Sequence, residues 1–282
     1  MRNILILFGL IFMFTSSLLA QQVYMENTQY LPQIAGGGYP SNDWETIIAI
    51  KNLTSDAGTV AVEFYGDNGS PLVFETSKGV ADHLGVSLNG FASEEITLLR
   101  NTGKPTQVGW AKFRSALKFS VSGNFKSYSN DVLIGLGGVL SSPAQLGFSC
   151  DLDPNNGIAI VNPNNITATV VVKVFDTTGV ELTANEIAFQ LTPGQHVAEY
   201  FWQQPFNLNQ KGMAVLLSNV PLSTVALRLD GIMFATIPIM PLPRRQDTKK
   251  IGITYLIPSD RVAQPDVAER MNEFFNVFQR FL

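Results

Sequence analysis

The amino-acid sequence predicts an all-β protein, built from two tandem β-sandwich modules and followed by a short C-terminal amphipathic helix. Three observations predict this class: an internal repeat, period-2 alternation of apolar and polar residues in each copy, and turn signals between short strands. The chain has 282 residues, 45% of them hydrophobic, which is enough for two cores. We expect these segments: signal peptide 1–20, first module 21–142, second module 143–243, and linker, short strand and helix 244–282.

The N-terminal segment has the layout of an export signal. A short positive region, Met1–Asn3, precedes an apolar run from Ile4 to Leu19, and the small residue Ala20 follows. We expect cleavage after Ala20, and a retained membrane anchor is the alternative because Leu18 is not the preferred small residue. The predicted location is secreted, periplasmic or cell-surface, with no membrane attachment once the signal is removed.

The internal repeat is the observation that divides the chain. The first two matched segments have an offset of 110 residues (48 to 158), and the third has an offset of 103 (109 to 212). The matched segments of the two copies are 48–52 with 158–162, 59–62 with 169–172, and 109–115 with 212–218. Two strands, the turn after them and a later strand therefore recur in the same order.

Within each copy, alternation marks strands with one face in a core and one face outside. The inward positions are Val60, Val62 and Phe64 in the first copy and Val170, Val172 and Val174 in the second. Glu63 and Lys173 fall at the same outward position, so we expect this face to meet water in both copies. Turns rich in Asn, Asp and Gly follow at 66–69 and 176–179, as hairpins require.

The segments 30–38, 67–72, 107–111 and 225–238, together with Asn52, resemble a group of poorly characterised exported bacterial proteins. Proteins of this group carry tandem immunoglobulin-like β-sandwich modules. The resemblance implies that both modules are immunoglobulin-like and that the protein works in a bacterial envelope or extracellular setting. Its motifs are structural, so the resemblance implies no activity and no catalytic residues.

The low charge content and the few reactive side chains narrow the function classes. Charged residues make up 15% of the chain and the net charge is −4, so we expect no nucleic-acid binding. The two histidines, His83 and His196, lie in no catalytic or metal-binding motif, and the loop Asp151–Gly157 has the wrong frame for calcium. We therefore predict no catalytic residues, no cofactor and no metal site.

Cys150 is the sole cysteine, so no intramolecular disulfide can form. It alternates in phase with Phe148 and Leu152, which favours a buried and inert core thiol. An intermolecular crosslink or a reactive thiol is the alternative interpretation.

Aromatic residues supply the candidate ligand-binding positions, because exposed rings on a sandwich stack on sugars or anchor a protein partner. Trp110 is the first candidate, since Lys112 and Arg114 share its face. Tyr200 and Trp202 form a second candidate cluster, for which the alternative is a loop that caps the sandwich. We expect a glycan or a protein as partner.

The C-terminal run from Asp266 to Leu282 has the pattern of an amphipathic helix. Its apolar face consists of Val267, Met271, Phe274, Phe278 and Phe281. This helix either packs on the second module, docks a partner or a second copy, or attaches to a membrane surface. The second module also has an apolar face at Met213, Val215 and Leu217, which the helix or the first module is expected to cover.

The function predicted from these observations is an exported, non-enzymatic β-sandwich repeat protein with a binding, adhesion or assembly role. The alternative is a secreted carbohydrate-binding accessory protein or a hydrolase.

Overall fold

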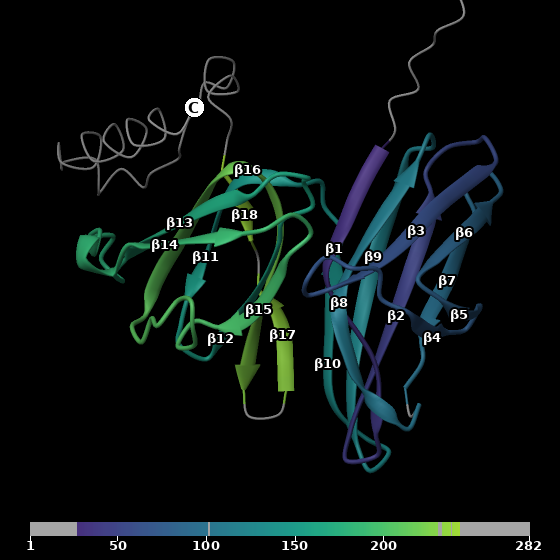
Figure 1. Ribbon diagram of the computed structural model, residues 1–282, viewed down its shortest axis with the longest axis horizontal. Coiled ribbons are helices and arrows are strands. Elements are labelled where there is room, and N and C mark those ends of the chain that lie inside the picture. Colours follow the sequence, from purple (N-terminus) through teal and green to yellow (C-terminus); the bar gives the residue numbers. More distant parts are fainter. Residues whose placement is uncertain (1–26, 101, 231–232, 238, 243–282) are drawn as a thin grey trace, which may run out of the picture.

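The structure is a computed structural model that describes residues 27–100, 102–230, 233–237 and 239–242. These residues form two β-structured halves that lie side by side (Figure 1). All strand pairs are antiparallel, and the described helical structure is limited to one 3₁₀ turn, Thr183–Asn185. The predicted all-β class is therefore confirmed. The predicted signal peptide and the predicted C-terminal helix lie outside the described residues.

The first half is a ten-stranded sheet that folds over and encloses one apolar core. Its neighbours run β6-β3-β8-β1 in one layer and β7-β2-β9-β10 in the other, and β4 and β5 extend the second layer beyond β7. The strands are β1 (Asn27–Tyr39), β2 (Asn42–Asn52), β3 (Gly58–Gly66), β4 (Phe74–Thr76), β5 (Gly79–Ala81), β6 (His83–Leu88), β7 (Ser93–Leu98), β8 (Lys104–Ser115), β9 (Phe119–Ser129) and β10 (Val132–Leu140).

The second half is an eight-stranded sheet with its own core. Its neighbours run β14-β13-β16-β11-β18 in one layer and β15-β12-β16-β17 in the other. The strands are β11 (Gln145–Leu152), β12 (Asn156–Val161), β13 (Ala168–Phe175), β14 (Ile187–Leu191), β15 (His196–Tyr200), β16 (Gly212–Asp230), β17 (Met233–Ile237) and β18 (Met240–Pro241). The long strand β16 belongs to both layers, because its first part pairs with β11 and β13 and its second part with β12 and β17.

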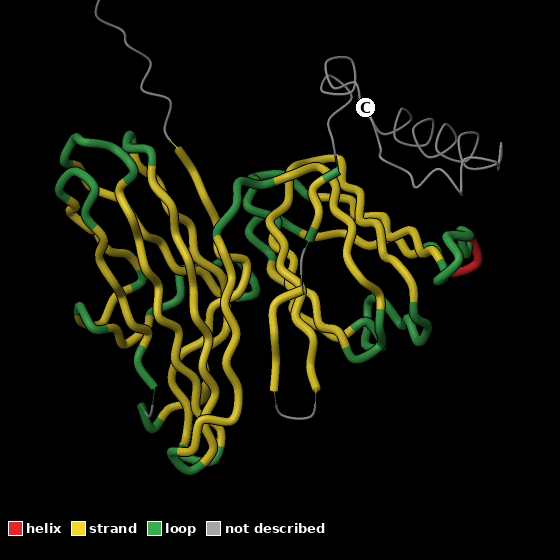
Figure 2. Tube along the Cα trace, turned by 180° about the vertical axis from the view of Figure 1, so that it is seen from behind, coloured by secondary structure: helices red, strands yellow, loops and turns green. Residues whose placement is uncertain are grey.

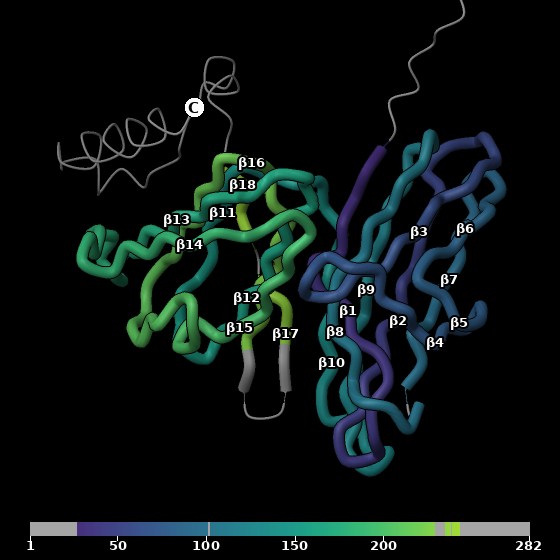
Figure 3. The backbone as a smooth tube through the Cα atoms, viewed as in Figure 1, coloured from purple at the N-terminus to yellow at the C-terminus, as the bar shows by residue number. Residues whose placement is uncertain are grey.

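The chain passes from the first half to the second through 141–144, between β10 and β11 (Figure 3). In the reverse view, strands make up most of both halves and the loops gather at their ends (Figure 2).

Alternation along β3 and β13 produces the two cores as the sequence predicts. The inward side chains of both strands are fully buried, which confirms their predicted phase. The outward position differs between the halves: Glu63 is partly exposed, whereas only 8% of Lys173 is exposed. The expectation that Lys173 meets water is therefore wrong. Its ammonium group reaches Glu181 at 2.7 Å and Glu186 at 3.6 Å, so ion pairing stabilises the charge while the stem is covered.

Cys150 lies on β11 and is 5% exposed, as its apolar phase predicts. Burial raises the pKa of its thiol to about 12, because the thiolate loses the solvation that water gives it. The apolar face of the second half is also largely covered, since Val215 and Leu217 are buried while Met213 is 40% exposed.

Candidate functional site

The two halves meet where the turn after β3 contacts the turn between β14 and β15; we call this the turn contact. Asn68 and Gln195 form an isolated antiparallel bridge across it. Gly69 and Gly194 approach so closely that a Cβ on either would lie 2.7 Å from the Cα of the other. Both glycines have positive φ, and no larger residue fits this approach without movement of the backbone.

His196 reinforces the turn contact from the second half. Its backbone N–H donates to the carbonyl oxygen of Asp67 at 2.9 Å, and its Nδ1 lies 2.8 Å from Oδ1 of the same residue. The imidazole is completely buried, and its Nε2 has no hydrogen-bond partner among the described residues. Because solvent does not reach this ring, His196 acts as a structural contact between the halves.

Trp110 also belongs to the turn contact, which corrects its predicted exposure. The side chain is 3% exposed, stacks on Tyr65 with ring centroids 4.4 Å apart, and donates from Nε1 to the carbonyl oxygen of Gly194 at 3.0 Å. The predicted free ring is therefore wrong, because a turn of the second half covers it. The neighbours Lys112 and Arg114 both form ion pairs with Glu63.

This cluster shifts two pKa values. Burial and the hydrogen bond to Glu63 raise the pKa of Tyr65 to about 12. Burial alone would raise the pKa of Glu63, but the hydrogen bonds from Tyr65 and Arg114 outweigh it and hold the pKa below its usual value.

Beside the turn contact lies a cleft of about 440 Å³ between the two halves, which we call the inter-half cleft. The first half contributes one wall from β1, β2, β8, β9 and β10, and the second half contributes the other from β12, β15 and β16. The first wall consists of Gln33, Ala35, Asn42, Trp44, Val108, Phe125, Ser127 and Ile134, and the second of Gly157, Ile158, Ala159, Ala198, Glu199, Tyr200 and Leu227.

Strand register shows which side chains of the second wall point into the inter-half cleft. Tyr200 lies opposite Gly157 and shares its face, which is the face turned towards the first half. Glu199 lies opposite Ile158, whose side chain packs in the core of the second half. Glu199 and Ile158 therefore line the cleft through backbone atoms, and Tyr200 supplies its aromatic side chain.

Of the aromatic candidates from the sequence, Tyr200 is the one that lines the inter-half cleft. Trp202 stacks on Tyr200 with ring centroids 6.0 Å apart and is 49% exposed, just outside the lining. Sequence reasoning missed Trp44. This residue lies on β2, in the wall opposite Tyr200, and its Nε1 donates to Oδ1 of Asn42 at 3.0 Å. Trp44 keeps the inward phase of Thr46 and Ile48, so the pattern made it indistinguishable from a core residue.

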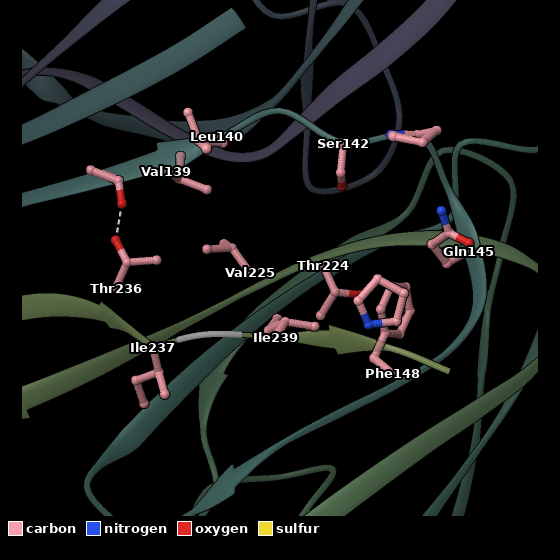
Figure 4. Close-up of a pocket in the computed structure, with 13 residues that line it drawn as sticks. Val139, Leu140, Ser142, Gln145, Phe148, Thr224, Val225, Thr236, Ile237 and Ile239 are labelled. Atoms are coloured by element: carbon pink, nitrogen blue, oxygen red, sulfur yellow. Dashed lines mark hydrogen bonds between the residues drawn. The ribbon is translucent and has the colours of Figure 1, made fainter. Parts of the chain in front are cut away.

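A second cavity of about 500 Å³ lies between β10 and the strands β11, β16, β17 and β18. Figure 4 shows Val139 on the first-half side, facing Val225 from the second half. The hydroxyl of Thr236 donates to the carbonyl oxygen of Gly138 and links the two strand edges. This cavity has mostly aliphatic walls, and we interpret it as a gap in the packing between the halves.

The structure brings together no trio of metal-ligating side chains within its described residues. His83 is exposed and contacts Asp82 at 2.6 Å, and neither residue lines the inter-half cleft. Within the described part of the chain, no helix has the length and apolar character needed to cross a membrane. The predicted helix residues Val267, Met271, Phe274, Phe278 and Phe281 lie outside the described residues.

Comparison with protein-family models, curated proteins and solved structures finds no match for this chain. The class of this protein is therefore defined by its fold and its site alone. It is an all-β protein of two sandwich-like halves that enclose a cleft at their junction.

Proposed function

We propose that the protein is an exported, non-enzymatic binding protein of the bacterial envelope or extracellular space, and that its ligand lies in the inter-half cleft. The observation that carries this proposal is the cleft itself, with a volume of about 440 Å³ and with Trp44 and Tyr200 on its opposite walls. Ligand sites in proteins have volumes of roughly 300–1,000 Å³ and form preferentially at junctions between domains.

We also propose that the halves are two immunoglobulin-like copies of one module. Their strand orders correspond, since β6-β3-β8-β1 matches β14-β13-β16-β11 and β7-β2-β9-β10 matches β15-β12-β16-β17. Cross-strand pairs support the alignment of the sequence: Lys112 lies opposite Glu63, and Val215 lies opposite Lys173. In this arrangement each copy supplies one wall of the site.

The non-enzymatic part of the proposal is supported by the burial of His196, one of the two histidines that contact a carboxylate. His196 is bound to Asp67 in the pattern of a catalytic base, but its ring is fully buried in the turn contact. A general base must lie within hydrogen-bond reach of its substrate, and this ring has no open side.

The proposal is tested by a thermal-shift screen of chemically diverse small molecules with the exported chain and with Tyr200→Ala. A ligand at 100 times its Kd stabilises the folded state by about 2.7 kcal/mol, or roughly 5–10 °C for a protein of this size. We expect stabilising compounds whose effect is lost in Tyr200→Ala. Phe91→Ala is the matched control, because it removes an exposed ring at the opposite end of β2 from Trp44. Compounds that stabilise parent and Tyr200→Ala equally would contradict the proposal.

A further inference from the structure

The lining of the inter-half cleft also indicates the chemistry of its ligand. This inference rests on the proposed function. Three aromatic residues (Trp44, Phe125 and Tyr200), three polar uncharged residues and several aliphatic residues line it, and Phe125 belongs to the core of the first half. On the second wall, Ala159 and Val225 pack with the core of the first half, which fixes the same face for their neighbours Tyr200 and Leu227.

No charged side chain points into the inter-half cleft from the described residues. Glu199 is turned to the face of Ile158, as its register shows. Asp43 and Glu45 flank Trp44 on β2 but alternate away from it, and Glu45 pairs with Lys126 at 2.8 Å. A charged ligand would lose its hydration on entering this cleft and would meet no opposite charge there. The lining therefore favours a neutral ligand.

The polar side chains of the lining suit a ligand that forms hydrogen bonds. Oε1 of Gln33 has no hydrogen-bond partner among the described residues, but it is also closed to solvent, so a ligand in the cleft meets other polar atoms. The hydroxyl of Ser127 and the side chain of Asn42 lie in the same lining and can both donate and accept.

The rings of Trp44 and Tyr200 favour a ligand with a flat, weakly polar face. Trp44 packs against the core of the first half, and Tyr200 stacks on Trp202 at a 15° interplanar angle. Burial raises the pKa of Tyr200, so its phenol stays protonated and uncharged at neutral pH. Saccharides combine a ring face that can stack with a rim of hydroxyl donors.

We propose that the inter-half cleft binds a neutral saccharide unit, whose ring face stacks on Trp44 or Tyr200 and whose hydroxyl groups form hydrogen bonds with Asn42 and Ser127. The ligand class is neutral because the lining is uncharged, and it is polyhydroxylated because the polar groups of the lining both donate and accept hydrogen bonds. Trp110 takes no part in it.

The test follows the indole N–H signals of the ¹⁵N-labelled exported chain by NMR, with Trp44, Trp110 and Trp202 assigned from single Trp→Phe variants. The probes are four neutral trisaccharides: cellotriose, maltotriose, mannotriose and triacetylchitotriose. Chitotriose, the deacetylated and cationic form of the last, and trigalacturonate, which is anionic, provide the charged comparison. We expect at least one neutral trimer to move the Trp44 signal and leave the Trp110 signal in place, and we expect the charged trimers to bind at least about tenfold more weakly.

Variants separate stacking from folding. We expect Tyr200→Ala to weaken binding by about tenfold or more, Tyr200→Phe to retain most of it because the ring remains, and Ser127→Ala to weaken it through loss of a hydroxyl group. Phe91→Ala should bind as the parent does, and thermal unfolding confirms that each variant is folded.

Two results would overturn the saccharide proposal: no neutral trimer moves the Trp44 signal, or a charged trimer binds as tightly as a neutral one. If the thermal-shift screen has then found a non-saccharide ligand that depends on Tyr200, the proposed function stands and only the ligand class is wrong. If neither experiment finds a ligand that depends on Tyr200, both proposals are wrong.

Discussion

At the scale of single residues, two buried asparagines show how the same side chain is used in both halves. Asn52 ends β2 and Asn162 directly follows β12, and both are almost fully buried. Each side chain donates to the backbone carbonyl four residues on, and each accepts from the backbone N–H two residues on. These bonds satisfy backbone groups in the loop that follows each strand, which explains why the matched segments of the sequence both end in Asn.

Cys150 gives a prediction at this scale. Because burial raises the pKa of its thiol to about 12, the reactive thiolate is scarce at pH 8 in the folded protein. We expect Cys150 to react with Ellman's reagent at least about a hundredfold more slowly in the native protein than in guanidinium chloride. Measurement of absorbance at 412 nm checks this, and rapid labelling of the native protein would show that β11 opens readily.

At the scale of elements, the turns after β3 and β13 have the same design but different surroundings. Gly69 and Gly179 occupy matching positions with φ of +78° and +85°. A Cβ on Gly179 would meet nothing within 4 Å, whereas a Cβ on Gly69 would meet the backbone of Gly194. The first turn therefore carries the contact between the halves, and the second does not.

This difference gives a matched pair of variants. Both Gly69→Ala and Gly179→Ala place a Cβ at positive φ, which costs about 1–2 kcal/mol. We expect Gly69→Ala to have a thermal midpoint several degrees below that of Gly179→Ala, because only the first variant also separates the turn contact. Small-angle X-ray scattering should show a larger radius of gyration for Gly69→Ala alone. Equal midpoints and equal radii would mean that the turn contact adds nothing to the stability of the junction.

At the scale of the whole molecule, several contacts hold the halves against each other, among them the packing of Ala159 and Val225 on the core of the first half. The turn contact joins β3 and β15 regions, and the edges of β10 and β17 meet through Thr236 and Gly138. The inter-half cleft lies at this junction, so its shape depends on these contacts. A site between two bodies has this property in general, because either wall alone is an open surface.

The tail gives the prediction at this scale. Five apolar residues between Val267 and Phe281 share one face of the predicted helix, and their exposure to water would be unfavourable. We expect deletion of 244–282 to leave the chain monomeric and to lower its thermal midpoint, because the helix then no longer covers apolar surface of its own chain. Light scattering after size exclusion gives the mass. An oligomeric full chain with a monomeric deletion variant would show instead that the helix serves self-association.

The sequence by itself determined the features that depend on local periodicity. The strand class, the inward phase of Val60 and Val170 and the burial of Cys150 all follow from period-2 alternation, which one short segment contains completely. Tyr200 could be singled out from an equally short segment, because it forms an aromatic cluster with Trp202. These properties require no knowledge of which other part of the chain lies nearby.

Only the tertiary structure decided what covers the outward faces. Trp110 and Lys173 both lie at outward positions, yet the first is covered by a turn about 84 residues away and the second by its own ion pairs. The inter-half cleft likewise joins β1 and β2 to β12 and β15, whose strands lie more than a hundred residues apart. The physical reason is that alternation specifies which side chains leave the core of their own sheet, whereas the docking of two halves specifies what those side chains then meet.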